Sequence, residues 1–269
     1  MDVLQSFLLG IIQGLTEFLP ISSSGHLVLG KQILGVEVET GITFEIVVHF
    51  GTLCSILIYY RKIIWDIIVS GVGFIRSPAQ KKEDPKVKLI GFILISMIPA
   101  MAIGFTLEDQ IEAIFSSPLL VSVMLIVTGL ILFSTRFVGE VDKEVNTARS
   151  FLIGIAQSFA MIPGISRSGS TISAALWLGV KREEAANFSF LMLIPVIAGA
   201  MLLEVSDLIE VGLSDAALIN LVTGFLAAFI SGYYALTYLI IILKRKGFHY
   251  FSYYCWAIGG VGLIYYLSV

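Results

Sequence analysis

The sequence predicts an all-α integral membrane protein with six transmembrane helices plus two re-entrant half-helix hairpins in an inverted-topology repeat. Of its 269 residues, 57% are hydrophobic and 14% are charged, which is about half the charged fraction of an ordinary soluble domain. Two apolar regions are interrupted by proline, serine and glycine, and the second of these regions repeats the first. The composition therefore predicts a bilayer protein, and the repeat divides it into two related halves.

The first predicted element is a hairpin over residues 3–34, which Pro20 and the serine run Ser22–Ser24 break in the middle. Each half is too short to cross a bilayer, because a crossing helix needs roughly 20 apolar residues. We expect two half-helices that enter and leave by one face of the membrane. Such backbone is tolerated at membrane depth only where protein or a wet cavity surrounds it. Residues 150–179 predict a second hairpin of the same kind.

Six further segments are apolar and uninterrupted over the length that a bilayer requires. We expect each of them to be a transmembrane helix. They are residues 42–60, 89–107, 116–135, 185–203, 216–243 and 250–269.

The charges between these elements predict their orientation. Basic residues gather in residues 61–88, 136–149, 181–182 and 244–246. The alternate loops, 108–112 and 204–215, carry only acidic charge. Basic loops stay on the cytoplasmic side of a membrane. We therefore expect both chain termini to lie outside.

The two hairpins are related by an internal duplication. A shift of 144 positions places the Gln13 and Ser22–Gly25 segments on Gln157 and Ser166–Gly169 without a gap. Three predicted spans separate the hairpins, and an odd number inverts the second copy. We expect one repeat over residues 1–135 and another over 150–269, each a re-entrant hairpin plus three spans. In such proteins the ligand site lies where the broken helices meet.

Polar side chains in the first hairpin predict a buried site. Gln13 and Glu17 are four residues apart, so they share one face of a helix. A carboxylate in hydrocarbon costs several kcal/mol and needs a partner, a cavity or a ligand. Pro20 ends this half-helix, and the serine run supplies N-cap hydroxyls for the next. The N-terminus of that next half-helix is a candidate anion site.

The second hairpin adds a fixed positive charge. Ser166 or Ser168 can cap its second half-helix, and Arg167 lies between them. A guanidinium group holds phosphate oxygens in a two-pronged fork. Two helix N-termini, an arginine and several hydroxyls therefore predict a phosphate or pyrophosphate pocket. The alternative for Arg167 is a structural pairing with Glu17.

Three further polar side chains lie in apolar surroundings. His26 stands within ten residues of Glu17 and beside the serine run, which favours a functional role. Glu45 lies one turn from His49 in a predicted span, and we expect it in the site. His49 is equally well explained by a hydrogen bond between helices or by a functional role.

Two segments resemble a known family: QGLTEFLPISSSGH at residues 13–26 and PGISRSGSTI at residues 163–172. They are similar to the undecaprenyl-pyrophosphate phosphatase family associated with bacitracin resistance, and the resemblance covers most of the chain. It implies hydrolysis of undecaprenyl pyrophosphate to undecaprenyl phosphate and inorganic phosphate, which recycles the lipid carrier for cell-wall synthesis. It also implies a bacterial plasma membrane enzyme whose active site faces outward.

The resemblance assigns residues to roles. The family's paired acidic motif falls on Gln13 and Glu17, and Gln13 stands where some members have glutamate. Its serine and histidine fall on Ser23 and His26. Its phosphate-binding segment falls on Ser166, Arg167, Ser168 and Thr171. The family is described as assisted by a divalent cation, Mg or Ca, although the sequence shows no ligand cluster for one.

We therefore expect four catalytic residues, Glu17, Ser23, His26 and Arg167. The expected substrate-binding residues are Gln13, Ser22, Ser24, Gly25, Glu45, Ser166, Ser168, Gly169 and Thr171. We expect Ser23 to attack phosphorus, His26 to accept its proton and Glu17 to orient the imidazole. Attack by His26 or by water are the alternatives.

The expected partners are the polyprenyl pyrophosphate lipid and membrane lipids, and a homodimer is possible. The net charge of −3 and the absence of a concentrated basic face give no support to nucleic-acid binding. The rival function is a transporter or flippase for an anionic lipid or solute, because inverted repeats with broken helices are typical of that class.

Overall fold

The structure, a computed structural model, describes residues 1–36, 41–115, 117–139, 142–210 and 215–268. Within these residues the protein is built from helices and contains no β-strand, so the predicted all-α class is confirmed. In chain order the helices are α1 (Val3–Phe18), α2 (Ser23–Ile33), α3 (Gly41–Tyr59), α4 (Arg61–Arg76), α5 (Pro78–Lys81), α6 (Pro85–Phe115), α7 (Pro118–Ser134), η2 (Thr135–Phe137), α8 (Thr147–Phe159), α9 (Arg167–Trp177), α10 (Arg182–Glu210), α11 (Asp215–Lys244), η3 (Phe248–Tyr250) and α12 (Phe251–Ser268).

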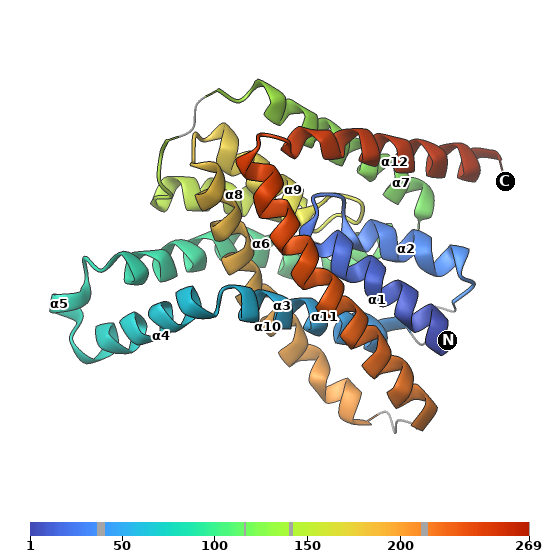
Figure 1. Cartoon of the computed structure of the whole chain (residues 1–269), viewed down its shortest axis with the longest axis horizontal. Coiled ribbons are helices and arrows are strands. Elements are labelled where there is room, and N and C mark those ends of the chain that lie inside the picture. Colours follow the sequence, from blue (N-terminus) through green and yellow to red (C-terminus); the bar gives the residue numbers. More distant parts are fainter. Residues whose placement is uncertain (37–40, 116, 140–141, 211–214, 269) are drawn as a thin grey trace.

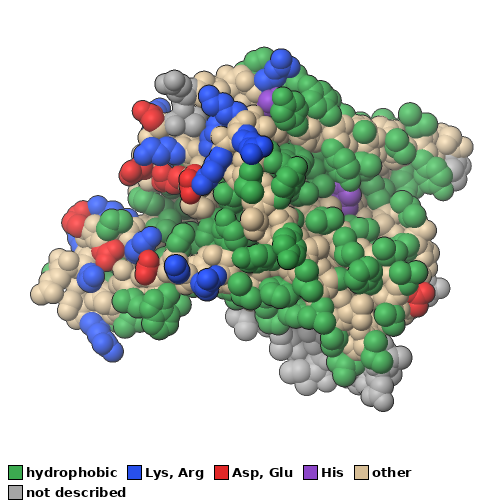
Figure 2. Space-filling view, viewed as in Figure 1, with side chains coloured by type: hydrophobic (Ala, Val, Ile, Leu, Met, Phe, Trp, Pro, Cys, Tyr) green, Lys and Arg blue, Asp and Glu red, His purple; other side chains and the backbone are tan. Residues whose placement is uncertain are grey.

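Among the described residues, three helical stretches are long and apolar enough to cross a membrane. They are Pro85–Gly104 in α6, Pro118–Phe137 in α7 with η2, and Ala217–Lys244 in α11. On the face of the molecule shown in Figure 2, hydrophobic side chains cover much of the surface outside the charged end. A water-soluble protein of this size would instead expose a mixed and charged surface. The chain is therefore an integral membrane protein.

The two interrupted regions each form a pair of helices, as the proline and serine signals predict. In the first region α1 ends at Phe18 and α2 begins at Ser23. In the second, α8 ends at Phe159 and α9 begins at Arg167. Both α2 and α9 have 11 residues, and their bounds differ by the 144 positions of the sequence repeat.

Small residues let each hairpin pack closely on a long helix. A Cβ atom built on Gly10 of α1 would lie 2.5 Å from the carbonyl oxygen of Gly224 in α11. A Cβ atom on Gly154 of α8 would lie 2.3 Å from the carbonyl oxygen of Ser96 in α6. Backbones approach this closely at small residues in membrane helix pairs. Gly10 and Gly154 are also 144 positions apart.

The tips of the two hairpins meet beside α7. A Cβ atom built on Gly25, in the first turn of α2, would lie 3.3 Å from the Cα atom of Gly164. Gly164 has φ +93°, in the left-handed region that favours glycine, and a Cβ there would lie 2.5 Å from the carbonyl oxygen of Val121. The polar segments that the sequence singles out are therefore neighbours in space.

Two predicted loops are helical in the structure. Residues 61–88 contain α4, α5 and the start of α6, and these helices project from the rest of the molecule (Figure 1). Apolar side chains such as Ile63 and Ile67 pack α4 against the core, which a reading based on charge alone missed. Residues 108–112 belong to α6, because the stretch contains neither proline nor glycine to end a helix. Of the predicted loop 204–215, residues 211–214 lie outside the described part of the chain.

Candidate active site

The carboxylate of Glu17, in the last turn of α1, is the centre of a polar cluster. Its Oε1 atom accepts a hydrogen bond from Nη2 of Arg167 at 3.0 Å. Its Oε2 atom accepts from Oγ of Ser23 at 2.7 Å and from Nε2 of Gln13 at 3.0 Å. The Glu17 side chain is only 7% exposed. A buried charge of this kind needs such partners, because an unpaired carboxylate would pay a large desolvation cost.

Arg167 links three elements from the first position of α9. Besides Glu17 of α1, its Nη1 atom donates to the backbone carbonyl of Ser189 in α10 at 3.1 Å. Its side chain is 15% exposed. A guanidinium group has five N–H donors, and these two contacts engage only part of them. The pairing with Glu17 that the sequence offered as an alternative is present, and it leaves donors for a further anion.

Ser23 and Arg167 occupy equivalent positions in the two repeats. Each begins the second half-helix of its hairpin, and they are 144 positions apart. Both donate to the same carboxylate. The duplication has therefore placed a hydroxyl on one oxygen of Glu17 and a guanidinium on the other.

The two half-helices have the same N-terminal cap. Ser22 Oγ accepts from the backbone N–H of Gly25 at 3.3 Å, and Ser166 Oγ accepts from Gly169 at 3.0 Å. In each cap the serine hydroxyl also lies 3.3 Å from that of the serine two residues later, Ser24 or Ser168.

The first backbone N–H groups of these two helices have no partner within the helix. The positive end of each helix dipole adds to their attraction for an anion. These caps are consistent with the predicted anion site.

Ser22 carries a backbone conformation that is unusual for its residue type. Its φ angle is +71°, in a region that costs a residue other than glycine free energy. Two hydrogen bonds offset this free-energy cost. The Oγ atom of Ser22 caps α2, and its carbonyl accepts a hydrogen bond from the His26 ring at 2.8 Å. Such strained residues often lie at functional sites.

His26 does not join the Glu17 cluster, so the arrangement in which it takes the Ser23 proton is corrected. Its Nδ1 atom is bonded to the Ser22 carbonyl, and its Nε2 atom lies 2.9 Å from the hydroxyl of Tyr254. Residues three apart lie only about 60° from each other around a helix, so the different directions of the two side chains follow from their hydrogen-bond partners and not from their spacing. Ser23 donates to Glu17 instead.

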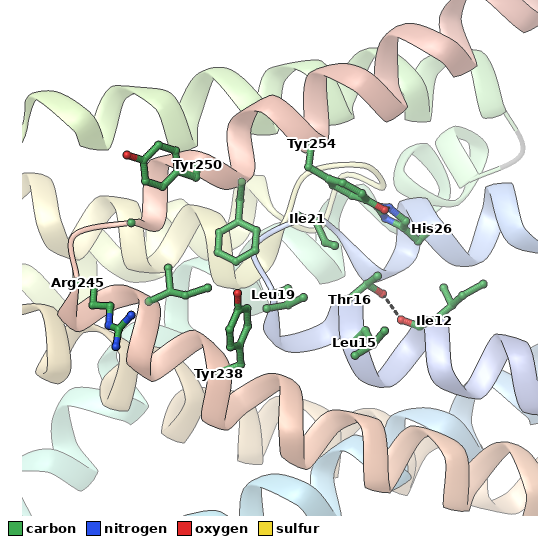
Figure 3. Close-up of a pocket in the computed structure, with 13 residues that line it drawn as sticks. Ile12, Leu15, Thr16, Leu19, Ile21, His26, Tyr238, Arg245, Tyr250 and Tyr254 are labelled. Atoms are coloured by element: carbon green, nitrogen blue, oxygen red, sulfur yellow. Dashed lines mark hydrogen bonds between the residues drawn. The ribbon is translucent and has the colours of Figure 1, made fainter.

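The His26 ring stacks on Tyr254 in a largely apolar cavity of about 720 Å³ (Figure 3). Residues of α1, α11 and α12 line the cavity, among them Leu15, Tyr238 and Phe251. The cavity therefore adjoins the first hairpin, and neither Glu17 nor Arg167 lines it.

Of the two polar residues of α3, the sequence predicted Glu45 in the site and left the role of His49 open, and the structure brings His49 closer to the Glu17 carboxylate. The Glu45 carboxylate forms an ion pair with Lys31 of α2 rather than entering the cluster. The backbone carbonyl oxygen of Glu45 lies within hydrogen-bond distance, 2.7 Å, of Nδ1 of His49. The His49 Nε2 atom lies 3.8 Å from Oε2 of Glu17. His49 is thus the member of this pair that faces the cluster.

Thr171 and two residues that the sequence reading missed support the second hairpin. Thr171 Oγ1 lies 2.6 Å from the Ser189 hydroxyl and donates to the Arg167 carbonyl at 2.9 Å. Thr128 of α7 accepts from the Ser166 N–H at 3.0 Å and donates to the Gly164 carbonyl at 2.8 Å. Ser189 lies 144 positions after Glu45, so the repeat could have identified it. No sequence signal singles out Thr128, because α7 also carries the hydroxyl residues Ser122 and Ser134.

The residues of the cluster do not fit a protein-held Mg or Ca ion. Such ions bind several oxygen ligands, usually including carboxylates. The cluster offers Glu17, whose two oxygens already accept from Arg167, Ser23 and Gln13. In the part of the chain that the structure describes, no three His, Cys, Asp or Glu side chains are grouped for a metal.

Comparisons with known proteins give a consistent result over nearly the whole chain. Residues 6–261 match the family model of the bacitracin resistance protein BacA. The chain is 42% identical over 264 residues to an undecaprenyl-diphosphatase of Salinibacter ruber, covering 96% of this chain and 97% of the relative. It is also 42% identical over 262 residues to an undecaprenyl-diphosphatase of Halothermothrix orenii, covering 96% of each chain.

Proposed function

Since this chain belongs to the bacitracin resistance protein BacA family, we infer that it is an integral membrane undecaprenyl-diphosphatase. It hydrolyses undecaprenyl pyrophosphate to undecaprenyl phosphate and inorganic phosphate. This reaction recycles the lipid carrier for cell-wall synthesis and confers resistance to bacitracin. The observation that carries the chemistry is the Glu17 carboxylate, which joins the Ser23 hydroxyl to the Arg167 guanidinium at two half-helix N-termini.

In the proposed mechanism the terminal phosphate of the lipid binds between these N-termini. Backbone N–H groups and the positive helix ends attract it, and Arg167 contributes N–H donors that Glu17 and Ser189 leave free. Phosphoryl transfer depends mainly on positioning and on stabilising charge around the transferred group. Seven residues build the two N-termini and hold them in place. They are Ser22, Ser24, Gly25, Ser166, Ser168, Gly169 and Thr171.

Ser23 is the proposed nucleophile, and Glu17 is its base. The 2.7 Å hydrogen bond from Ser23 to Glu17 is the nucleophile-plus-base contact that such attack requires. The serine oxygen bonds to the terminal phosphorus, its proton passes to Glu17, and the anhydride bond breaks to release undecaprenyl phosphate. Water then hydrolyses the phosphoserine. Gln13 supports the carboxylate through its side-chain amide, so one carboxylate is enough for this mechanism.

His26 has a different part in this proposal from the one that the resemblance implies. Its ring nitrogens contact the Ser22 carbonyl and Tyr254. We assign it to positioning the tip of the first hairpin, where Ser22 holds its strained backbone and Ser23 begins α2. The mechanism routes no proton through it.

We further propose six transmembrane helices and two re-entrant hairpins in inverted repeats over residues 1–135 and 150–269. The matching bounds and caps of α2 and α9 support this topology, as does the glycine packing of α1 on α11 and of α8 on α6. The long or apolar helices α3, α10 and α12 cover the remaining predicted spans 42–60, 185–203 and 250–269.

The proposed location is the bacterial plasma membrane, with the active site and both termini on the outer side. Basic side chains gather at one end of the molecule, whereas the two termini lie at the opposite end (Figures 1 and 2). Basic segments remain in the cytoplasm, which supports this orientation.

Phosphate release from detergent-solubilised protein tests the function, because no transport can occur without a closed membrane. We expect the wild type to release phosphate from undecaprenyl pyrophosphate. Glu17→Gln should bind the lipid and lose about 10²-fold or more in turnover, the usual contribution of a general base. An inactive wild type that exchanges lipid across vesicle membranes would instead favour the transporter alternative.

A further inference from the structure

His49 lies where a proton could leave the Glu17 cluster. Its Nε2 atom is 3.8 Å from Oε2 of Glu17, the same oxygen that accepts from Ser23. The His49 side chain is 32% exposed, whereas that of Glu17 is 7% exposed. One nitrogen of the ring therefore faces the buried carboxylate while the ring itself reaches the molecular surface.

The proposed reaction must release a proton from this buried place. Splitting a diphosphate with water forms two monophosphates, and because a phosphate ester has a second pKa of about 6, the products release about one proton near neutral pH. Glu17 takes the Ser23 proton in the first step. It must lose that proton before it can act as a base again.

The other described partners of the Glu17 carboxylate cannot carry this proton away. Arg167 stays protonated in proteins, and the amide of Gln13 does not titrate. Ser23 is the group from which the proton comes. Imidazole, in contrast, gains and loses a proton in the physiological pH range.

We propose that His49 is a proton relay, which accepts at Nε2 the proton that Glu17 has taken from Ser23 and releases it to water at the surface. This inference rests on the proposed phosphatase function. It adds a residue to the mechanism that neither the sequence motifs nor the resemblance assigned to catalysis. The protons balance over the two steps: the Ser23 O–H bond breaks first, and Glu17 passes that proton through His49 to water outside the cluster. When water then attacks the phosphoserine, a proton of that water passes through Glu17 to the departing Ser23 oxygen.

The surroundings of His49 hold its ring in the orientation that a relay needs. The Nδ1 atom lies 2.7 Å from the Glu45 carbonyl, an acceptor, so the proton of a neutral ring is on Nδ1 and Nε2 is free to accept. The charged groups around it are Glu17 of α1 with its partner Arg167 of α9, and Glu45 of its own helix with its partner Lys31 of α2. Glu45 is polar and partly exposed one turn away, which continues the polar path toward the surface.

Chemical rescue distinguishes a relay from a structural contact. Phosphate release from undecaprenyl pyrophosphate in detergent is measured for the wild type, His49→Ala, His49→Gln and His249→Ala, with added imidazole or with sodium chloride of equal ionic strength. His249 is the matched control, because it lies in η3 between α11 and α12, outside the cluster. Imidazole is small enough to enter the space that alanine leaves, whereas glutamine fills that space without titrating.

We expect His49→Ala to lose about tenfold or more in kcat, within the range of proton-transfer effects, while its KM stays within about twofold of wild type. Added imidazole should restore His49→Ala in proportion to its concentration, and should leave His49→Gln slow. His249→Ala should behave like the wild type.

Each of the following results would overturn the relay. Full turnover in His49→Gln would show that a polar contact is sufficient. A rise in KM alone would make His49 a substrate contact. A loss without rescue, together with a lower melting temperature, would make it structural. An inactive wild type would refute the proposed function and the relay with it, whereas an active wild type with unaffected variants refutes only the relay.

Discussion

Glu17 gathers its partners from distant parts of the chain. Arg167, which contacts one of its oxygens, is 150 residues away in sequence, and His49 approaches the other from α3. Because the carboxylate is buried, removing any one partner leaves the remaining charges less well compensated. Substitutions in this cluster should therefore be judged on folding as well as on activity.

The Arg167 side chain provides a test of geometry at constant charge. Arg167→Lys keeps a positive charge but loses the planar fork that reaches Glu17 and Ser189 together. We expect the variant to insert normally and to lose about 10³-fold in kcat, a typical contribution of an arginine to phosphoryl transfer. Steady-state phosphate release, with gel filtration as the folding check, measures this. Near-normal turnover would mean that Arg167 supplies charge alone.

The nucleophile can be identified from the phosphoenzyme. Phosphoserine survives acid and phosphohistidine does not, so acid quenching during turnover separates Ser23 from His26. We expect an acid-stable phosphoenzyme in the wild type and in His26→Ala, and none in Ser23→Ala, because Ser23 contacts the base Glu17. An acid-labile species that persists in Ser23→Ala and disappears in His26→Ala would make histidine the nucleophile. The absence of any phosphoenzyme would favour direct attack by water.

The short helices α2 and α9 depend on the long helices that hold them. Both α2 and α9 have 11 residues, a length at which an isolated helix is marginal. Their first partners, α1 and α8, lie on α11 and α6 through glycine contacts. The position of each N-terminal cap therefore depends on how α1 packs on α11 and how α8 packs on α6.

A substitution at the contact of α8 with α6 tests this dependence. Gly154→Ala would place its Cβ atom 2.3 Å from the Ser96 carbonyl oxygen, and overpacking of this kind costs about 1–3 kcal/mol. We expect a lower melting temperature, and we expect reduced activity because the second hairpin, which carries Arg167, would shift. Gly91→Ala in α6 is the matched control, because no atom lies within 4 Å of its added Cβ. Equal melting temperatures in the two variants would contradict the packing argument.

One end of the molecule carries most of the Lys and Arg side chains in view, together with Asp and Glu, and the two termini lie at the other end (Figures 1 and 2). For a protein that crosses a bilayer this distribution sets the orientation, because basic segments resist translocation. In the proposed orientation the projecting helices α4 and α5 lie in the cytoplasm and the C-terminal end of α12 lies outside. The orientation determines on which side of the membrane the proposed diphosphate site receives its substrate.

Cysteine labelling in intact cells tests the orientation. In a variant whose two native cysteines, Cys54 and Cys255, are replaced by alanine, we expect Leu267→Cys to react with a membrane-impermeant maleimide from outside. Lys82→Cys and Lys143→Cys should react only after permeabilisation. All three native side chains are exposed, so access to the reagent depends on the side of the membrane. Labelling of Lys143→Cys in intact cells would refute the inverted repeat.

The sequence alone determined the class of the protein, the positions of the two helix breaks and most residues of the cluster. These features are local: apolar composition sets the solvent, and proline, serine and glycine act on the few residues beside them. The sequence repeat also places Ser23 and Arg167 at equivalent positions, immediately after the capping residues Ser22 and Ser166.

Only the tertiary structure decided how these residues meet. The Glu17 carboxylate could have faced His26, Ser23 or Arg167, and the outcome depended on how the hairpins cross and on how each helix is rotated about its axis. The structure turned His26 toward Tyr254, paired Glu45 with Lys31 and brought His49 to Glu17. A rotation of one helix by a single residue, about 100°, would exchange these partners, and packing between distant segments sets that rotation.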